Sequence, residues 1–205
     1  MAIAQLKQEQ QELKQHLLAQ QWNVFGTLKF VNGRTIGHNT ADLLLRSYWN
    51  RIDRVFFGRA AERQNLRVPR WCFAHEGSDS ENFHVHFALL SPLADVAHVC
   101  AVLNAVWTQH HPQTAPLEKN WIMPVVSRSR VANYLTREYW RMGSATYLEH
   151  ISCPSCDFAK MAKYTDERQT DRIRRAVSPL WLRQAQQELI LQQAEYQTNH
   201  SSVVS

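Results

Sequence analysis

Cysteine is scarce in this chain of 205 residues, and long apolar runs, internal repeats and a phosphate-binding loop are missing. The four cysteines are too few for a disulfide scaffold, which favours a reducing compartment, the cytoplasm. No run of about 18 apolar residues occurs, so no membrane-spanning helix is expected. The Gln- and Lys-rich first segment lacks the apolar region of a secretory signal. Without a G-x-x-x-x-G-K-S/T motif, no helicase is expected within the chain.

The remaining composition indicates one domain with appended helices. A formal net charge of +5 is compatible with a nucleic-acid partner but does not require one. We expect an N-terminal helical extension over residues 1–21, a central domain over 22–145, and a C-terminal helical region with a disordered tail over 146–205. The N-terminal helix is expected to dock on the domain, to mediate self-association or to project into solvent.

Apolar and aromatic segments bounded by turn residues predict strands over residues 22–30, 68–76, 82–90 and 120–126. Apolar residues at three- and four-residue spacing predict helices over 41–64, 92–109, 127–141 and 180–197. Thr40 is expected to cap the first of these helices and Pro92 to begin the second. The order is the split βαβ pattern. We therefore predict an α+β fold, with a central antiparallel β-sheet of ferredoxin-like or RRM-like topology flanked by helices.

Two histidines in the third strand, His84 and His86, point to the same face because strand side chains alternate. Two imidazoles on one rigid face suit a divalent metal, although such a pair also occurs in strands without one. Counting back from the Gly/Ser/Asp-rich hairpin loop places Glu76 opposite residue 82 or His84, on the same face. Glu76 is then either a third ligand or an ordinary strand-end charge. Glu81, the competing carboxylate, faces away unless a bulge intervenes.

A later helix presents a tyrosine among arginines. Arg130, Tyr134, Arg137 and Arg141 fall at i, i+4, i+7 and i+11, which predicts one stripe on a helix capped by a serine at position 127 or 129. By itself the stripe is equally consistent with a half-buried tyrosine edged by solvated arginines. Beside a metal, however, the phenolate of a tyrosine becomes less costly to form, and the phenol can attack phosphorus.

Three segments, in this order, resemble motifs of the His-hydrophobic-His (HUH) endonucleases. Within that superfamily they are most similar to rolling-circle replication initiators of plasmids, phages and circular single-stranded DNA viruses. FGTLKF at 25–30 looks like the first motif, and FHVHFALL at 83–90 looks like the metal-binding second motif. VANYLTR at 131–137 looks like the third, in which a nucleophilic Tyr is followed three residues later by Lys. Arg137 replaces that Lys, keeping the charge and adding a bidentate grip on phosphate.

The resemblance implies sequence-specific nicking of one DNA strand at a replication origin. Tyr134 is the implied nucleophile and Arg137 its catalytic partner. The implied product is a 5′-phosphotyrosine together with a free 3′-OH that primes synthesis. Glu76, His84 and His86 are the implied ligands of Mg²⁺ or Mn²⁺, and this ligand set would also accept zinc.

The same resemblance implies a nucleic-acid surface and a set of partners. Lys29, Arg130 and Arg141 are expected to contact DNA. The expected partners are single-stranded DNA or an origin hairpin, together with a host helicase and polymerase. No membrane is expected to take part, and a bacterial plasmid or phage origin fits the cytoplasmic location.

Several alternatives remain at this level. Tyr139 lies five residues after Tyr134, about 500° around a helix, which favours a single-Tyr enzyme unless the helix begins late and Tyr139 is the nucleophile. A single-Tyr transposase or a conjugative relaxase would use the same chemistry, but relaxases usually have a three-His cluster and the sequence pattern does not reveal one. A non-catalytic origin-binding protein is the alternative from another class. Two other families with a His-x-His pair are excluded. Cupins need a Glu a few residues after the pair, but the first Glu after His86 is Glu118. Histidine-triad hydrolases need a third His at position 88, which is Ala88 here.

Cys153 and Cys156, with His150 just before them, resemble half of a zinc site. A structural zinc site needs four ligands, and no second pair completes this one. Two free thiols are the simpler interpretation.

Overall fold

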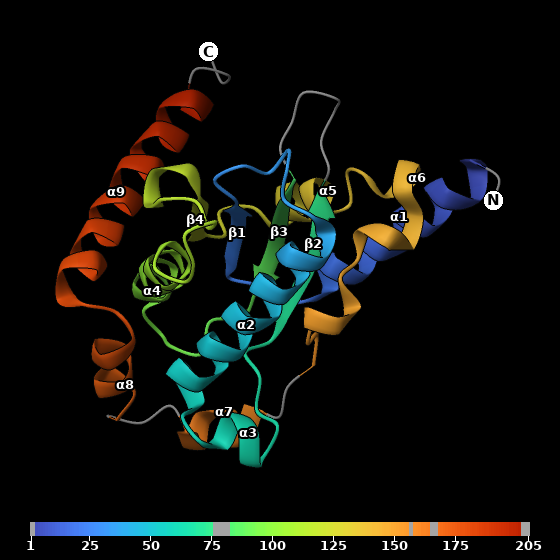
Figure 1. Cartoon of the computed structure of the whole chain (residues 1–205). Helices are drawn as coiled ribbons and strands as arrows, with labels where there is room; N and C mark the ends of the chain where they lie inside the picture. Colours follow the sequence, from blue (N-terminus) through green and yellow to red (C-terminus); the bar gives the residue numbers. More distant parts are fainter. Residues whose placement is uncertain (1–2, 76–82, 156–157, 165–167, 202–205) are drawn as a thin grey trace.

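The protein folds around a four-stranded antiparallel sheet with strand order β2-β3-β1-β4 (Figure 1). The structure, a computed structural model, describes residues 3–75, 83–155, 158–164 and 168–201. The strands are β1 (Val24–Lys29), β2 (Arg70–His75), β3 (His84–Leu89) and β4 (Trp121–Pro124). The order β-α-β-β-α-β and the antiparallel pairing confirm the predicted α+β class and split βαβ topology.

The helices account for the rest of the regular structure. In chain order they are α1 (Ile3–Ala19), α2 (His38–Phe57), α3 (Ala60–Arg63), α4 (Val96–Thr108), η1 (Leu117–Lys119), α5 (Arg128–Leu135), α6 (Tyr139–Met142), η2 (Gly143–Thr146), η3 (Glu149–Ile151), α7 (Phe158–Tyr164), α8 (Arg168–Ala176) and α9 (Pro179–Ser201). Within the described ranges, no helix combines the length and the apolarity needed to cross a membrane.

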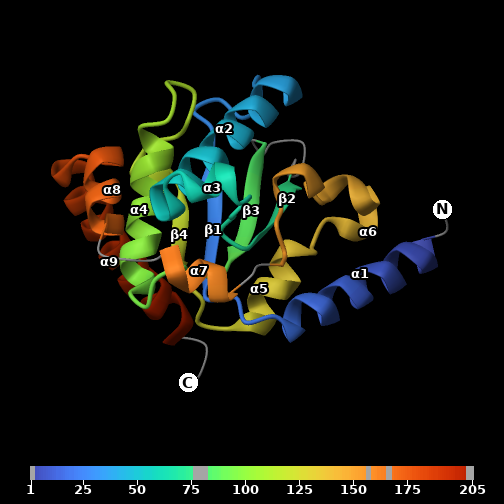
Figure 2. The same cartoon turned by 90° about the horizontal axis from the view of Figure 1, so that it is seen from below.

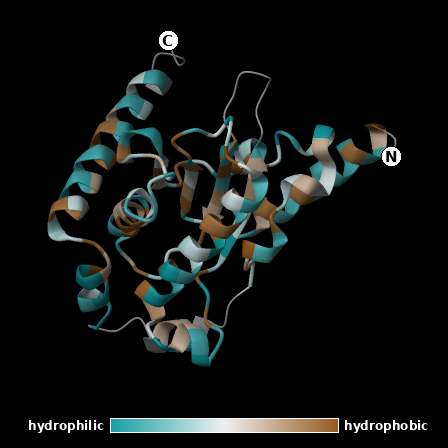
Figure 3. Ribbon diagram, viewed as in Figure 1, coloured by the Kyte–Doolittle hydropathy of each residue, from teal (hydrophilic) through white to brown (hydrophobic). Residues whose placement is uncertain are grey.

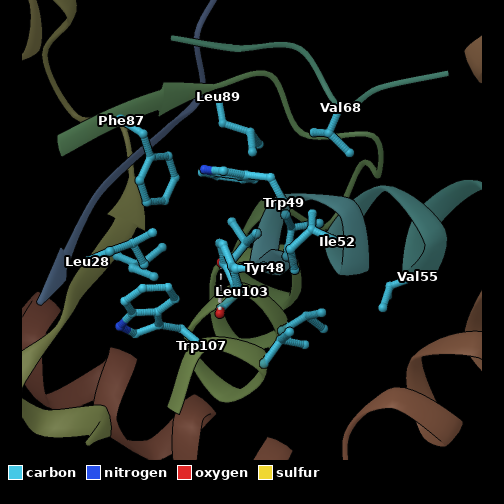
Figure 4. Packing of buried hydrophobic residues seen from close by; sticks show 14 of the residues in the cluster. Leu28, Tyr48, Trp49, Ile52, Val55, Val68, Phe87, Leu89, Leu103 and Trp107 are labelled. Atoms are coloured by element: carbon cyan, nitrogen blue, oxygen red, sulfur yellow. Dashed lines mark hydrogen bonds between the residues drawn. The ribbon is translucent and has the colours of Figure 1, made fainter. Parts of the chain in front are cut away.

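One face of the sheet packs against α2 and α4 and forms the main core (Figure 4). Trp49 of α2 meets Phe87 of β3 edge to face at 5.2 Å, and the hydroxyl of Tyr48 donates to the Leu103 carbonyl at 3.1 Å. Phe87 also explains a glycine in the neighbouring strand. A Cβ on Gly26 would lie 2.3 Å from the Phe87 ring, so this position of the first motif accepts no side chain without repacking.

The opposite face of the sheet is covered by α5 and α1, so that α2 and α5 lie on opposite sides in Figure 2. A second apolar cluster forms there. Its buried members are Leu17, Trp22, Trp71, Phe73, Ala88, Ala132 and Leu135. The amide of Gln10 in α1 donates to the Thr136 carbonyl just after α5, at 2.6 Å. Of the three arrangements expected for the N-terminal helix, docking on the domain is therefore the one observed.

The C-terminal helices α8 and α9 pack against α2 and α4, respectively. The hydrophilic helix α8 (Figure 3) places Arg172 at the end of α2, where the guanidinium donates to the carbonyls of Val55 and Phe56. Helix α9 packs on α4 and β4, and Gln192 donates to the Asn120 carbonyl at 2.8 Å. Helix α9 continues through Ser201, so the predicted end at residue 197 was wrong. Residues 202–205, the remainder of the expected disordered tail, lie outside the described ranges.

Three of the predicted helices have boundaries that were wrong. The first helix begins after Gly37 rather than at a Thr40 cap, and it ends at Gly58, whose φ of 59° breaks the expected 41–64 helix. The second begins at Val96, after an Asp95 side chain that accepts from the His98 amide, rather than at Pro92. The third starts as predicted, with Ser127 accepting from the Arg130 amide, but stops at Leu135.

A buried ion pair ties the second strand to α2. Arg70, at the start of β2, donates to both carboxylate oxygens of Asp53 at 2.8 and 3.1 Å, and both side chains are almost completely buried. Removing one partner of such a pair typically costs about 3–5 kcal/mol, because the other charge is left without compensation. The pair therefore fixes the strand that carries His75 at its other end.

Candidate metal and tyrosine site

Three histidines converge on the sheet face that α5 covers. His75 ends β2, and His84 and His86 belong to β3; one ring nitrogen from each lies within 4.8 Å of those of the other two. The Nε2 atoms of His84 and His86 are 3.0 Å apart. All three residues are buried, with His75 at 0 % exposure. The arrangement is a compact three-nitrogen donor set on rigid strands.

The donor set fits a divalent transition metal. Within the described residues, neither ring nitrogen of His75 has a well-formed hydrogen bond, although both are buried. Buried polar atoms without partners are rare and costly, and coordination by an ion would satisfy one of these two. Three neutral imidazoles are a common ligand set for transition ions.

A threonine on the neighbouring strand orients one of these histidines. Thr27 of β1 pairs directly with His86, and its Oγ1 lies 2.8 Å from His86 Nδ1. When Nδ1–H donates to this hydroxyl, Nε2 presents its lone pair to the cluster. Thr27 thus occupies the position from which a hydrogen-bond partner fixes the tautomer and the ring orientation of a metal-binding histidine.

Burial lowers the pKa of two of the three histidines and so favours their neutral form. It lowers the pKa of His75 to about 3, with His84 and Arg137 adding to the effect and the Leu135 backbone opposing it. Burial also lowers the pKa of His86 well below its usual range, and the neighbouring His75 and His84 lower it further. Neutral imidazole is the form that binds metal, so the site is prepared for a cation at neutral pH.

Tyr134 lies against the cluster. Its ring meets His86 edge to face, with centroids 4.6 Å apart, and lies parallel to His75 at 6.3 Å. The side chain is 40 % exposed, so one side of the ring remains open to solvent. Phe25 of the first motif completes the contact, with its ring edge to face with Tyr134 at 5.7 Å. The phenol of Tyr134 thus lies beside the candidate cation site, and its solvent-exposed side is accessible to a substrate.

The arginine stripe predicted around Tyr134 is only partly formed, because α5 ends at Leu135 and a new helix begins at Tyr139. The guanidinium of Arg137 lies over the Tyr134 ring, 4.9 Å from its centroid, and its Nε is 3.3 Å from Glu138. Arg141 instead pairs with Glu138 at 2.7 Å, and it is not among the residues that line the cavity at the site. The expectation of one continuous stripe was therefore wrong.

The alternative tyrosine faces a different part of the molecule. The Tyr139 hydroxyl lies 3.4 Å from the carboxylate of Glu9 in α1, and this contact and burial raise its pKa. Tyr139 is also absent from the residues that line the cavity. Of the two tyrosines considered, Tyr134 is the one placed beside the histidines.

A cavity of about 840 Å³ opens in front of His84, His86 and Tyr134. Of the three residues expected to contact DNA, Lys29 and Arg130 line it and Arg141 does not. Arg130 donates to the hydroxyl of Tyr196 in α9 at 3.0 Å, so the C-terminal helix also forms part of the wall.

The hairpin register differs from the predicted one by one residue. His75, rather than Glu76, lies opposite His84, and Phe73 lies opposite His86. The third histidine was missed because this register was miscounted, and the three-His cluster that the sequence pattern did not reveal is present. The available signal was the FAHE sequence at 73–76, in which a His directly precedes the chosen Glu. Glu76 and Glu81 themselves lie outside the described residues.

The segment considered as half a zinc site gives no such cluster in the described residues. His150 pairs with Asp42 of α2, and the backbone of Cys153 bonds to that of Arg70 at the edge of β2. Cys156 lies outside the described residues.

Comparison of the chain with known protein families, curated proteins and solved structures finds no match. The candidate site therefore has to be interpreted from its own residues and geometry.

Replacing Thr27 with Val should weaken metal binding. The substitution keeps the shape but removes the hydroxyl bonded to His86 Nδ1, and loss of such an outer partner typically lowers affinity by about 10–100-fold. Titration calorimetry with Mn²⁺ measures the effect. Thr146→Val is the matched control, because it removes a buried threonine hydroxyl bonded to the Gly143 carbonyl outside the site. Equal affinities for the two variants would contradict the role of Thr27.

Proposed function

We propose that the protein is a metal-dependent endonuclease and strand transferase for single-stranded DNA that uses Tyr134 as its nucleophile. The observation that carries this proposal is the contact between Tyr134 and a buried three-His cluster, with ring centroids 4.6 Å apart at His86. The resemblance of residues 25–30, 83–90 and 131–137 to the three HUH motifs supports the same assignment. The resemblance implies Glu76 as the third ligand beside His84 and His86. Among the described residues, His75 is the third donor that lies beside this pair.

The chemistry follows from the placement of these groups. A divalent ion held by His75, His84 and His86 would polarise a non-bridging oxygen of the scissile phosphate. The Tyr134 phenol gives up its proton to solvent, its oxygen attacks phosphorus, a P–O bond to tyrosine forms, and the P–O3′ bond breaks. The 3′ oxygen leaves and takes up a proton, while the DNA 5′ end stays on Tyr134. Reversal with a new 3′-OH rejoins the strand, because the phosphotyrosine conserves the bond energy.

Charged residues at the cavity suit a phosphate-bearing strand. Arg137 is close to Tyr134 and carries a planar donor array that matches phosphate, so it stabilises negative charge in the transition state. Lys29 and Arg130 line the same cavity and provide further positive charge. Arg141 lies beyond this cavity and is at most an outer contact for a longer strand.

The biological role that the resemblance implies is initiation of rolling-circle replication. The enzyme would nick an origin, in single-stranded DNA or a hairpin, and leave a 3′-OH for a host polymerase. The chain carries no phosphate-binding loop for a helicase, so strand separation falls to a host helicase or to the hairpin itself. This work would take place in the cytoplasm of a bacterium that carries the plasmid or phage.

One observation favours a second candidate within the same chemistry. Conjugative relaxases usually have a three-His cluster, and His75, His84 and His86 form one here. A relaxase would nick a transfer origin and pass the covalently held strand to another cell. The two functions differ in the DNA sequence recognised and share the Tyr134 step.

The ligand set also bears on the choice between Mg²⁺ and Mn²⁺. Mg²⁺ is a hard cation that prefers oxygen ligands, whereas three imidazoles suit transition ions. Of the two ions, we therefore propose that Mn²⁺ binds better to the three histidines. A carboxylate ligand from Glu76 would increase the relative affinity for Mg²⁺.

The direct test is a search for the covalent adduct. The protein is incubated with Mn²⁺ and a pool of labelled single-stranded oligonucleotides, and denaturing gels report any labelled protein. A labelled band that disappears after protease treatment supports the proposal. Absence of the band with every oligonucleotide, hairpins included, would contradict it and favour a protein that only binds DNA.

A further inference from the structure

The cavity in front of Tyr134 extends well beyond the residues that the proposed chemistry uses. One end is formed by His84, His86, Tyr134 and Arg137. The other end is enclosed by β4, the start of α5 and the C-terminal helix α9. Its total volume of about 840 Å³ exceeds what one phosphate group requires and lies in the range of sites for drug-sized ligands.

The sheet connects the two ends. His86 of β3 pairs with Thr27 of β1, and Thr27 pairs with Trp121 of β4. Directly opposed residues of neighbouring strands share a face, so these three side chains form a row across the sheet. Trp121 lies two strand spacings from His86, about 10 Å. A chain of nucleotides bound at the histidines therefore reaches Trp121 without leaving the cavity.

Helix α9 supplies the facing wall. Ala185 and Leu189 are buried and hold the helix on the core, and Gln192 bonds to the Asn120 carbonyl at the start of β4. Tyr196 follows Gln192 by one helical turn and so lies on the same side of α9. Its hydroxyl accepts from Arg130, and both residues line the cavity. Trp121 and Tyr196 are partly buried and pack against the core, which restricts the motion of both rings.

The charge of the lining selects the kind of ligand. Among the described residues of the cavity wall, Lys29, Lys119, Arg130 and Arg137 are cationic, and Glu118 is the single carboxylate. Aromatic rings between cationic side chains are the usual design of a surface for single-stranded nucleic acid, where bases stack and phosphates are neutralised.

We propose that the end of the cavity between β4, α5 and α9 is a base-binding subsite, in which Trp121 and Tyr196 stack on an unpaired base next to the scissile phosphate. This inference rests on the proposed function for the identity of the ligand as DNA. It gives the C-terminal helix a direct role in holding the substrate, with Arg130 pairing to the adjoining phosphate.

Binding of two probe strands tests the subsite without any need for cleavage. Fluorescence anisotropy without added metal compares a labelled oligothymidylate with an abasic strand of the same length, which has the same charge and no bases. The full-length protein should prefer the oligothymidylate. Tyr196→Ala should lower affinity for it by at least about fivefold, the small end of the range for one base stack, and leave abasic binding unchanged.

Two further variants control the experiment. Tyr196→Phe keeps the ring and removes the bond to Arg130, so it should retain the preference for bases. Trp181→Ala removes an exposed aromatic ring of the same helix outside the cavity and should bind as the parent protein does. Circular dichroism of each variant verifies the helix content.

The outcomes separate this inference from the proposed function. If the covalent adduct forms but Tyr196→Ala binds oligothymidylate as tightly as the parent protein, the subsite is wrong and the nuclease stands. If no adduct forms but base preference depends on Tyr196, the subsite stands and the nuclease is wrong. A parent protein without any preference for the base-bearing strand would overturn the subsite directly.

Discussion

Tyr134→Phe is expected to abolish the covalent DNA adduct and to reduce nicking by at least about 1000-fold, since the phenol hydroxyl is the group that bonds to phosphorus in the proposed step. The Tyr134 ring contacts to Phe25, His75 and His86 would survive, because they involve ring carbons rather than the hydroxyl. Metal affinity and binding of single-stranded DNA should therefore remain at parental values. Denaturing gels measure the adduct, and anisotropy measures the binding.

Tyr139→Phe is the matched control for this variant. Its hydroxyl points to Glu9 in α1 rather than to the cavity, so nicking and adduct formation should persist. An adduct that survives in Tyr134→Phe and disappears in Tyr139→Phe would transfer the nucleophile to Tyr139. It would also require α5 and α6 to rearrange when DNA binds, because Tyr139 follows a break in the helix.

His75→Ala is expected to remove metal binding and metal-dependent nicking as completely as His84→Ala and His86→Ala do. Loss of an outer partner alone costs about 10–100-fold in metal affinity, and loss of one of three direct ligands should cost at least that much. Because burial lowers the pKa of His75 to about 3, the ring is neutral at neutral pH, and the variant loses a ligand rather than a charge. Titration calorimetry with Mn²⁺ and the adduct assay measure the two effects.

The comparison that matters most is with Glu76→Gln. If His75 supplies the third ligand, Glu76→Gln should bind Mn²⁺ far better than His75→Ala does. The reverse order would restore the Glu/His/His triad that the motif resemblance implies. His98→Ala, on the helix α4 away from the cluster, controls for the loss of a histidine as such and should behave as the parent protein.

The sequence was sufficient to predict the sheet and much of the site. The alternation of side chains in a strand is a local property, so His84 and His86 could be placed on one face without knowledge of any partner strand. The order of strands and helices was equally readable, because each element has its own pattern and the split βαβ order allows few topologies. Tyr134 could be assigned to a helix beginning near Ser127 for the same reason.

The third ligand and the shape of the substrate site were decided by the tertiary structure. Which residue of β2 lies opposite His84 depends on how the hairpin closes, and a shift of one residue turns every side chain to the other face. The observed register places His75 opposite His84 and so brings a third imidazole to the cluster. The stripe of arginines was broken by the end of α5 at Leu135 and by the pairing of Arg141 with Glu138. Tyr196 meets Arg130 from 66 residues away along the chain, and only the packing of α9 on β4 brings the two together. Local periodicity thus determined which residues within one element share a face, and non-local packing determined which of those faces meet.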